Sequence, residues 1–124
     1  MMNRGDLFIQ MLLVAFVVFL GYLSILKTFN IGGGIVSTIE VYAGGDKVLH
    51  FVGAGVVAFM FCYIYRHRFC PNRIAFWLMF LLLLEEGSQV FFPNRHFNLD
   101  DIGAGCVGVL ISVSIFKLFS SNGR

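Results

Sequence analysis

The run IAFWLMFLLLLEEGSQVFF, Ile74–Phe92, decides the fold class because it is almost wholly apolar until two adjacent carboxylates near its end. Three other apolar runs match it in length: Leu7–Leu26, Val48–Tyr65 and Ile102–Phe119. Each run has 18 to 20 residues, and a helix of that length spans the hydrocarbon core of a bilayer, which is about 30 Å thick. We therefore predict an all-α membrane protein, a single domain over residues 1–124 built as a four-transmembrane-helix bundle.

The composition agrees with a membrane protein and excludes several other classes. Of the 124 residues, 58% are hydrophobic and only 13% are charged, which is too few for a water-exposed surface on a domain of this size. The net charge of +2 is too small to indicate a nucleic-acid partner. Cys62, Cys70 and Cys106 have no CxxC spacing, so neither a disulfide framework nor a zinc site is expected. No cofactor motif is present, and we expect no cofactor.

Basic residues predict the orientation of the spans. They cluster before the first span, between the second and third, and after the fourth: Arg4, Arg66, Arg68, Arg73, Lys117 and Arg124. The positive-inside rule then places both termini in the cytoplasm. The first run is too long for a cleaved signal peptide, and we interpret it as a signal anchor.

Small residues predict which spans are neighbours. Ala54 and Ala58 in the second span, and Ala104 and Gly108 in the fourth, each have the small-xxx-small spacing that lets helix backbones approach closely. We expect these two spans to pack together. The 21-residue loop Lys27–Lys47 is either a short segment lying on the outer interface or a loosely ordered connector.

The outer ends of the spans carry the unusual polar residues. Ionisable groups at membrane depth are costly and are therefore functional candidates. The candidate catalytic residues are His50, Glu86 and Asp101. The candidate ligand-binding residues are Lys47, Gln89 and Arg95. Asp46 and Asp100 are expected to act as helix caps and interface anchors. Asn98 is an alternative cap for the last span.

Each candidate also has a structural interpretation. Lys47 could extend toward lipid headgroups, and Arg95 could form an ion pair with Asp101 or Glu86 instead of binding a ligand. Glu85 points about 100° away from Glu86, toward headgroups or another partner. A metal site through the three candidate catalytic residues is conceivable, but no HExxH-type spacing supports one, so no metal is predicted.

At these residues the chain resembles the VanZ-like family of small bacterial membrane proteins. The resemblance runs through Asp46-Lys47-x-x-His50-Phe51, Glu86-x-x-Gln89, Pro93-x-Arg95, Asp101 and Gly108, about half of the chain. Gly105 departs from the pattern, since the family usually has asparagine there. The resemblance implies a multi-pass protein of the bacterial cytoplasmic (inner) membrane. The founding member is associated with low-level resistance to glycopeptide antibiotics such as teicoplanin, which act outside the membrane on lipid-linked cell-wall precursors.

Three functions remain open from the sequence. The first is binding or modulation of cell-envelope components by an outward-facing polar site, with membrane lipids, lipid-linked cell-wall precursors or other envelope proteins as partners. The second is an intramembrane hydrolase or transferase in which His50 or Glu86 is the general base. The third is a membrane scaffold whose buried ions fix helix packing. An oligomer is compatible with all three.

Overall fold

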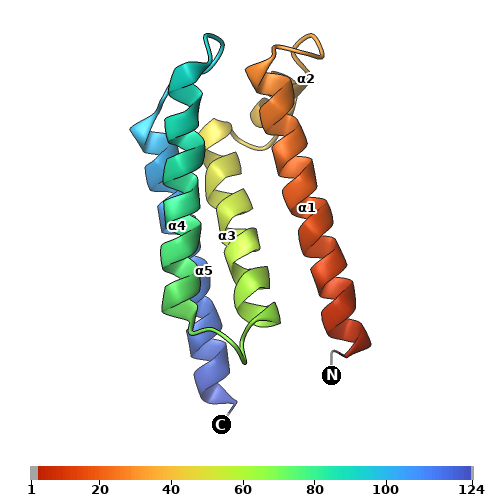
Figure 1. Ribbon diagram of the computed structural model, residues 1–124, viewed down its shortest axis with the longest axis vertical. Helices are drawn as coiled ribbons and strands as arrows, with labels where there is room; N and C mark the ends of the chain where they lie inside the picture. The colour runs from red at the N-terminus through yellow and green to blue at the C-terminus, as the bar shows by residue number, and fades with distance from the viewer. Residues whose placement is uncertain (1–2, 124) are drawn as a thin grey trace.

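The computed structural model describes residues 3–123, and all of the regular secondary structure in that range is helical (Figure 1). The elements, in chain order, are α1 (Arg4–Thr28), α2 (Ile35–Tyr42), α3 (Asp46–Ile64), α4 (Pro71–Ser88), the 3₁₀ helix η1 (Gln89–Phe91) and α5 (Leu99–Asn122). Four segments are long and apolar enough to cross a membrane: α1, α3, α4 with η1, and α5. The predicted all-α fold is confirmed, and four of its helical segments are long and apolar enough to span a membrane, which indicates a multi-pass membrane protein.

The outer surface of the bundle is apolar, as expected for helices that face lipid. Large side chains such as Val18, Trp77 and Leu118 are exposed along the spans. Such a surface would aggregate in water, whereas hydrocarbon solvates it well.

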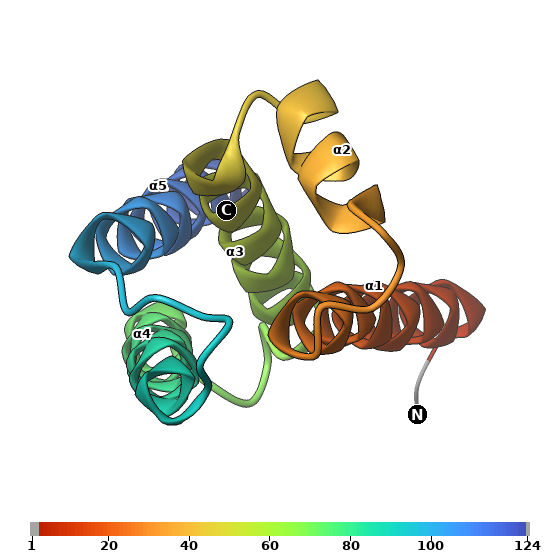
Figure 2. The same cartoon turned by 90° about the horizontal axis from the view of Figure 1, so that it is seen from above.

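Helices α3 and α5 form the tightest pair, with backbones almost in contact (Figure 2). A methyl group added at Gly108 would lie 2.2 Å from the carbonyl oxygen of Phe51, so only glycine fits there. One added at Gly55 would lie 3.0 Å from the Ser112 hydroxyl. Ala58 is fully buried in the core beside them. The predicted contact between the second and fourth spans is confirmed.

The other two spans pack around this pair at different distances. Helix α4 contributes Ile74 and Ala75 to the core. Helix α1 packs on α3, where Leu20 lies against Gly53. Within the described residues no extended contact joins α1 to α4, and Figure 1 shows α1 on one side of α3 and α4 on the other.

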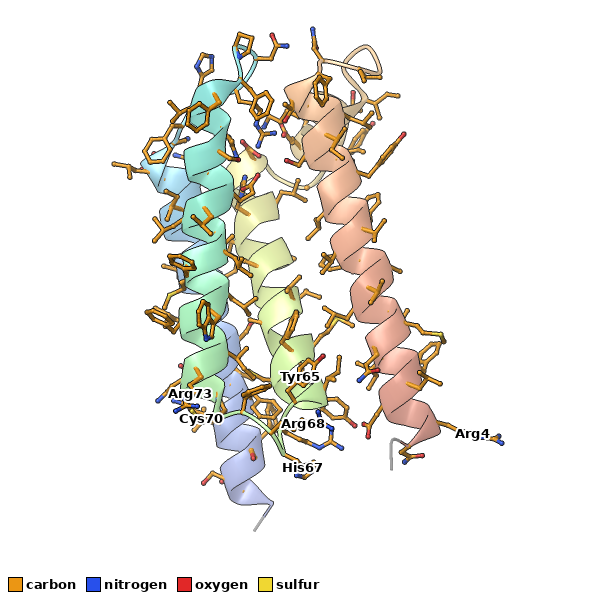
Figure 3. All side chains as sticks on the ribbon, in the orientation of Figure 1. Arg4, Tyr65, His67, Arg68, Cys70 and Arg73 are labelled. Carbon is orange, nitrogen blue, oxygen red and sulfur yellow. The ribbon has the colours of Figure 1, made fainter. Side chains whose placement is uncertain are left out.

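The two ends of the bundle differ in chemistry. Both termini and the α3–α4 loop lie at one end, where Figure 3 shows Arg4, His67, Arg68 and Arg73. At the opposite end the Lys27–Lys47 loop contains the short helix α2, which begins after Gly34, a glycine with φ of 92° that other residues rarely adopt. The candidate site residues lie at this α2 end.

Local sequence explains where the helices near the polar end begin and stop. Helix α4 ends at Ser88 and continues as η1 only to Phe91, because Phe92 precedes Pro93 and is held in an extended conformation. Glu86 therefore lies in the last turn of α4. Asn98 caps α5 by accepting a hydrogen bond of 3.0 Å from the Asp100 amide.

Candidate functional site

A cavity of about 450 Å³ lies between α1, α3 and α4. Away from the α2 end its walls are apolar: Val17, Leu20, Val57, Phe61, Leu78, Leu81 and Leu82. Toward the α2 end its walls are polar: Ser24, Lys27, Glu40, Asp46, His50, Glu85 and Arg95. Because α1 and α4 are not packed together, the apolar part adjoins the lipid-facing gap between them. The cavity thus has an apolar part and a polar part, as the chain and the headgroup of an amphiphile do.

His50 and Glu86 lie together at the polar end of this cavity. The Nε2 atom of His50 is 3.7 Å from Oε1 of Glu86 and 3.5 Å from Oδ1 of Asp46. Gln89 donates a 3.0 Å hydrogen bond to the same Glu86 oxygen. The Glu86 side chain is 1% exposed although it carries a carboxylate. Three predicted site residues, from α3, α4 and η1, are therefore in direct contact.

Glu85, which was expected to point toward headgroups or another partner and was not among the candidate site residues, belongs to the site. Its Oε1 accepts hydrogen bonds from Ser24 at 3.3 Å, from Gln89 at 3.1 Å and from Arg95 at 3.5 Å. Arg95 thus pairs with Glu85 and not with Asp101 or Glu86, the two alternatives weighed from the sequence. Arg95 itself is buried. Glu85 consequently joins α1 to α4 at the polar end of the cavity.

Lys27 is the second residue whose role the sequence did not indicate. Its ammonium group lies 2.6 Å from Glu40 on α2 and 2.9 Å from Asp46 on α3. One cation therefore holds three helices together. The only sequence signal was its position in the last turn of the first helix, where a cation interacts favourably with the helix dipole.

Lys47 and Asp100 lie outside the cavity. They form a 2.8 Å ion pair between the starts of α3 and α5, with side chains 60% and 68% exposed. Lys47, a candidate ligand-binding residue, therefore does not line the cavity, and its long side chain turns toward α5. Asp46 and Asp100 both occupy the first turn of their helices, the position expected for interface anchors, while Gly45 and Asn98 are the caps.

Asp101 is buried near His50, and one of its carboxylate oxygens receives no hydrogen bond. The side chain lies in the first turn of α5 and is 6% exposed as a residue. Among the described residues, its Oδ1 and the Oε2 of Glu86 are the buried side-chain oxygens without a partner. Buried carboxylate oxygens without a donor are costly. A proton, a water molecule or a cation at these oxygens would remove this cost.

Gly105 faces α4 close to this cluster. A Cβ atom there would lie 3.0 Å from a terminal methyl group of Leu82, one helical turn before Glu86. The asparagine usual in the VanZ-like pattern would therefore have to displace Leu82, which also lines the cavity. The glycine leaves this wall of the site apolar.

No protein-family pattern, no curated protein and no solved structure matches this chain. The resemblance to the VanZ-like family therefore stays a prediction from the motif residues, and the function rests on the geometry of the site.

Proposed function

We propose that this protein binds an amphiphilic component of the bacterial cell envelope, with the headgroup at the polar end of the cavity and the acyl or prenyl chain along its apolar walls. The observation that carries the proposal is the cavity between α1, α3 and α4, which changes from apolar to ionic along its length. A chain-like ligand could enter from the bilayer between α1 and α4, because these helices are not packed together.

The charges at the polar end favour a headgroup rich in hydrogen-bond donors. The polar walls include three carboxylates, Glu40, Asp46 and Glu85, against the two cations Lys27 and Arg95. Both cations are already paired with these carboxylates. A phosphate group of a ligand would find few hydrogen-bond donors on the cavity wall that are not already paired. Hydroxyl, amide and ammonium groups of a ligand would find acceptors there. The headgroups of lipid-linked glycans and peptides offer these donors.

The predicted topology indicates on which side of the membrane the proposed headgroup would bind. If the basic end with Arg68 and Arg73 is cytoplasmic, the cavity's polar end faces the periplasm or the exterior. Lipid-linked cell-wall precursors are displayed on that side. The resemblance to the VanZ-like family supports the same setting and a link to glycopeptide resistance, by a protein that binds or modulates the antibiotic's target.

A pair of matched variants tests the proposal. Gly21 lines the cavity, and a Cβ atom added there would meet nothing within 4 Å, so the Gly21→Phe side chain can begin without a clash and its ring is expected to occupy the cavity. Gly103→Phe adds the same bulk on the outer face of α5, which is equally open. Native mass spectrometry should detect a co-purified envelope lipid on the wild type and on Gly103→Phe, but not on Gly21→Phe. Equal lipid occupancy in all three proteins would refute the proposal.

A second candidate function is an intramembrane hydrolase or transferase acting on lipid-linked substrates. It is favoured by one observation, the contact of His50 with buried Glu86 at the headgroup end, since such a pair could remove a proton from water. The Ser88 hydroxyl is not directed at this pair, because it donates a hydrogen bond to the Glu85 carbonyl of its own helix. Glu86→Gln should then abolish turnover while the fold and lipid binding survive; substantial turnover in that variant would exclude this candidate.

A further inference from the structure

Carboxylates from three helices surround His50. One ligand atom from each of Asp46, His50 and Asp101 lies within 4.8 Å of the other two. Oε1 of Glu86, from α4, lies 3.7 Å from the Nε2 atom of His50. One imidazole with two or three carboxylates is a ligand set used by divalent transition-metal ions, because such ions accept both nitrogen and oxygen.

The unpartnered oxygens provide an independent reason to place a cation here. Asp101 Oδ1 and Glu86 Oε2 are buried and receive no hydrogen bond. The nearby cationic side chains have other partners: Lys27 forms ion pairs with Glu40 and with the Oδ2 oxygen of Asp46, and Arg95 forms one with Glu85. Lys47 is paired with Asp100 at the surface. Of the three carboxylates around His50, Asp46 is paired with Lys27, whereas Glu86 and Asp101 have no lysine or arginine partner among the described residues, which costs free energy in a buried site.

We infer that Asp46, His50 and Asp101 bind one divalent transition-metal ion, with Glu86 beside it as a further oxygen ligand. A second group, His50 with Glu85 and Glu86, has similar spacing, but Glu85 Oε1 already accepts three hydrogen bonds. The Asp101 oxygen, in contrast, has no partner. Metal bonds of about 2.1 Å bring tetrahedral ligand atoms to roughly 3.4 Å from one another. Side-chain rotations alone could supply that contraction.

This site goes beyond the proposed function and does not depend on it, since the ion is held by protein side chains alone. The two can therefore fail separately. Binding of the ion is tested with metal and no lipid, and binding of the amphiphile is tested by lipid occupancy. A protein that binds metal but no envelope lipid would refute only the proposed function.

The experiment measures metal content in the full-length protein. The protein is purified in detergent through a tag without histidine, stripped with a chelator, dialysed against Zn²⁺ and assayed by mass spectrometry of the metal. We expect about one Zn²⁺ per wild-type chain, and at least a tenfold lower affinity in His50→Gln and Asp101→Asn, as loss of a ligand or its support causes. His96→Gln is the matched control, because His96 is exposed in the loop before α5.

Two results would overturn the inference. One is a wild-type protein that retains no stoichiometric Zn²⁺ or Mn²⁺ after dialysis. The other is a folded His50→Gln variant that retains as much metal as the wild type. If the variants do not fold, pulsed EPR of the Mn²⁺-loaded wild type decides: hyperfine coupling to an imidazole nitrogen supports the site, and its absence refutes it.

Discussion

The contact between α3 and α5 makes a quantitative prediction at Gly108. In Gly108→Ala the new methyl group would start 2.2 Å from the Phe51 carbonyl oxygen, whereas carbon and carbonyl oxygen rarely approach closer than about 3.3 Å. The two helices must therefore separate by about 1 Å. Overpacking of this kind costs typically 1–3 kcal/mol. The upper end applies here, because the obstacle is backbone and not a flexible side chain.

Gly103→Ala is the matched control for this prediction. It lies on the same helix, where the added methyl group meets nothing within 4 Å. Both variants gain the same intrinsic helix preference of alanine over glycine, about 1 kcal/mol. The difference between them therefore isolates the clash, and we expect Gly108→Ala to be less stable than Gly103→Ala by about 3 kcal/mol.

Denaturant titration in detergent micelles, followed by far-UV circular dichroism, measures this difference. We expect Gly103→Ala to match or exceed the wild type in the free energy of unfolding. We expect Gly108→Ala to unfold at clearly lower denaturant concentration. Equal stability of the two alanine variants would show that α3 and α5 do not approach as closely as described.

Two further predictions concern the polar cluster. Arg95→Leu should lower the free energy of unfolding by roughly 1–3 kcal/mol, because it leaves Glu85 without its buried cation. Lys47→Gln should leave the free energy of unfolding unchanged, because its pair with Asp100 is exposed. Equal losses of stability in the two variants would contradict this. Glu86→Gln should raise the thermal melting temperature in metal-free buffer, because it removes a buried charge that has an unpartnered oxygen. A melting temperature several degrees lower would instead favour the scaffold function.

The fold was largely predictable from the sequence because membrane helices are defined by length and hydropathy. The four runs lie almost entirely within the spans of the structure, and the glycine and alanine spacing identified the neighbouring pair. The end of α4 was less predictable. The predicted span continued to Phe92, but Pro93 holds Phe92 in an extended conformation, and the α-helix already gives way to a 3₁₀ turn at Gln89.

The side-chain partners in the site were less predictable for a physical reason. A helix that is apolar all round has no polar stripe to show which face points inward. Glu85 and Glu86 could be placed relative to each other, but not relative to α1 or α3. Lys27 meets Glu40 only because α2 folds back over the end of α1. Such contacts depend on helix rotation and loop docking, which a single sequence does not encode in its periodicity.

Site-specific photo-crosslinking tests the central claim, that the cavity binds an envelope amphiphile, most directly. A benzophenone amino acid is placed at Leu81, which lines the cavity, or at Leu83, which is about 200° around the same helix and similarly exposed. After irradiation of living cells, the adduct masses are compared. We expect Leu81 to yield one discrete lipid-linked glycan or peptide species and Leu83 to yield bulk phospholipids. The same mixture of phospholipids at both positions would contradict the claim.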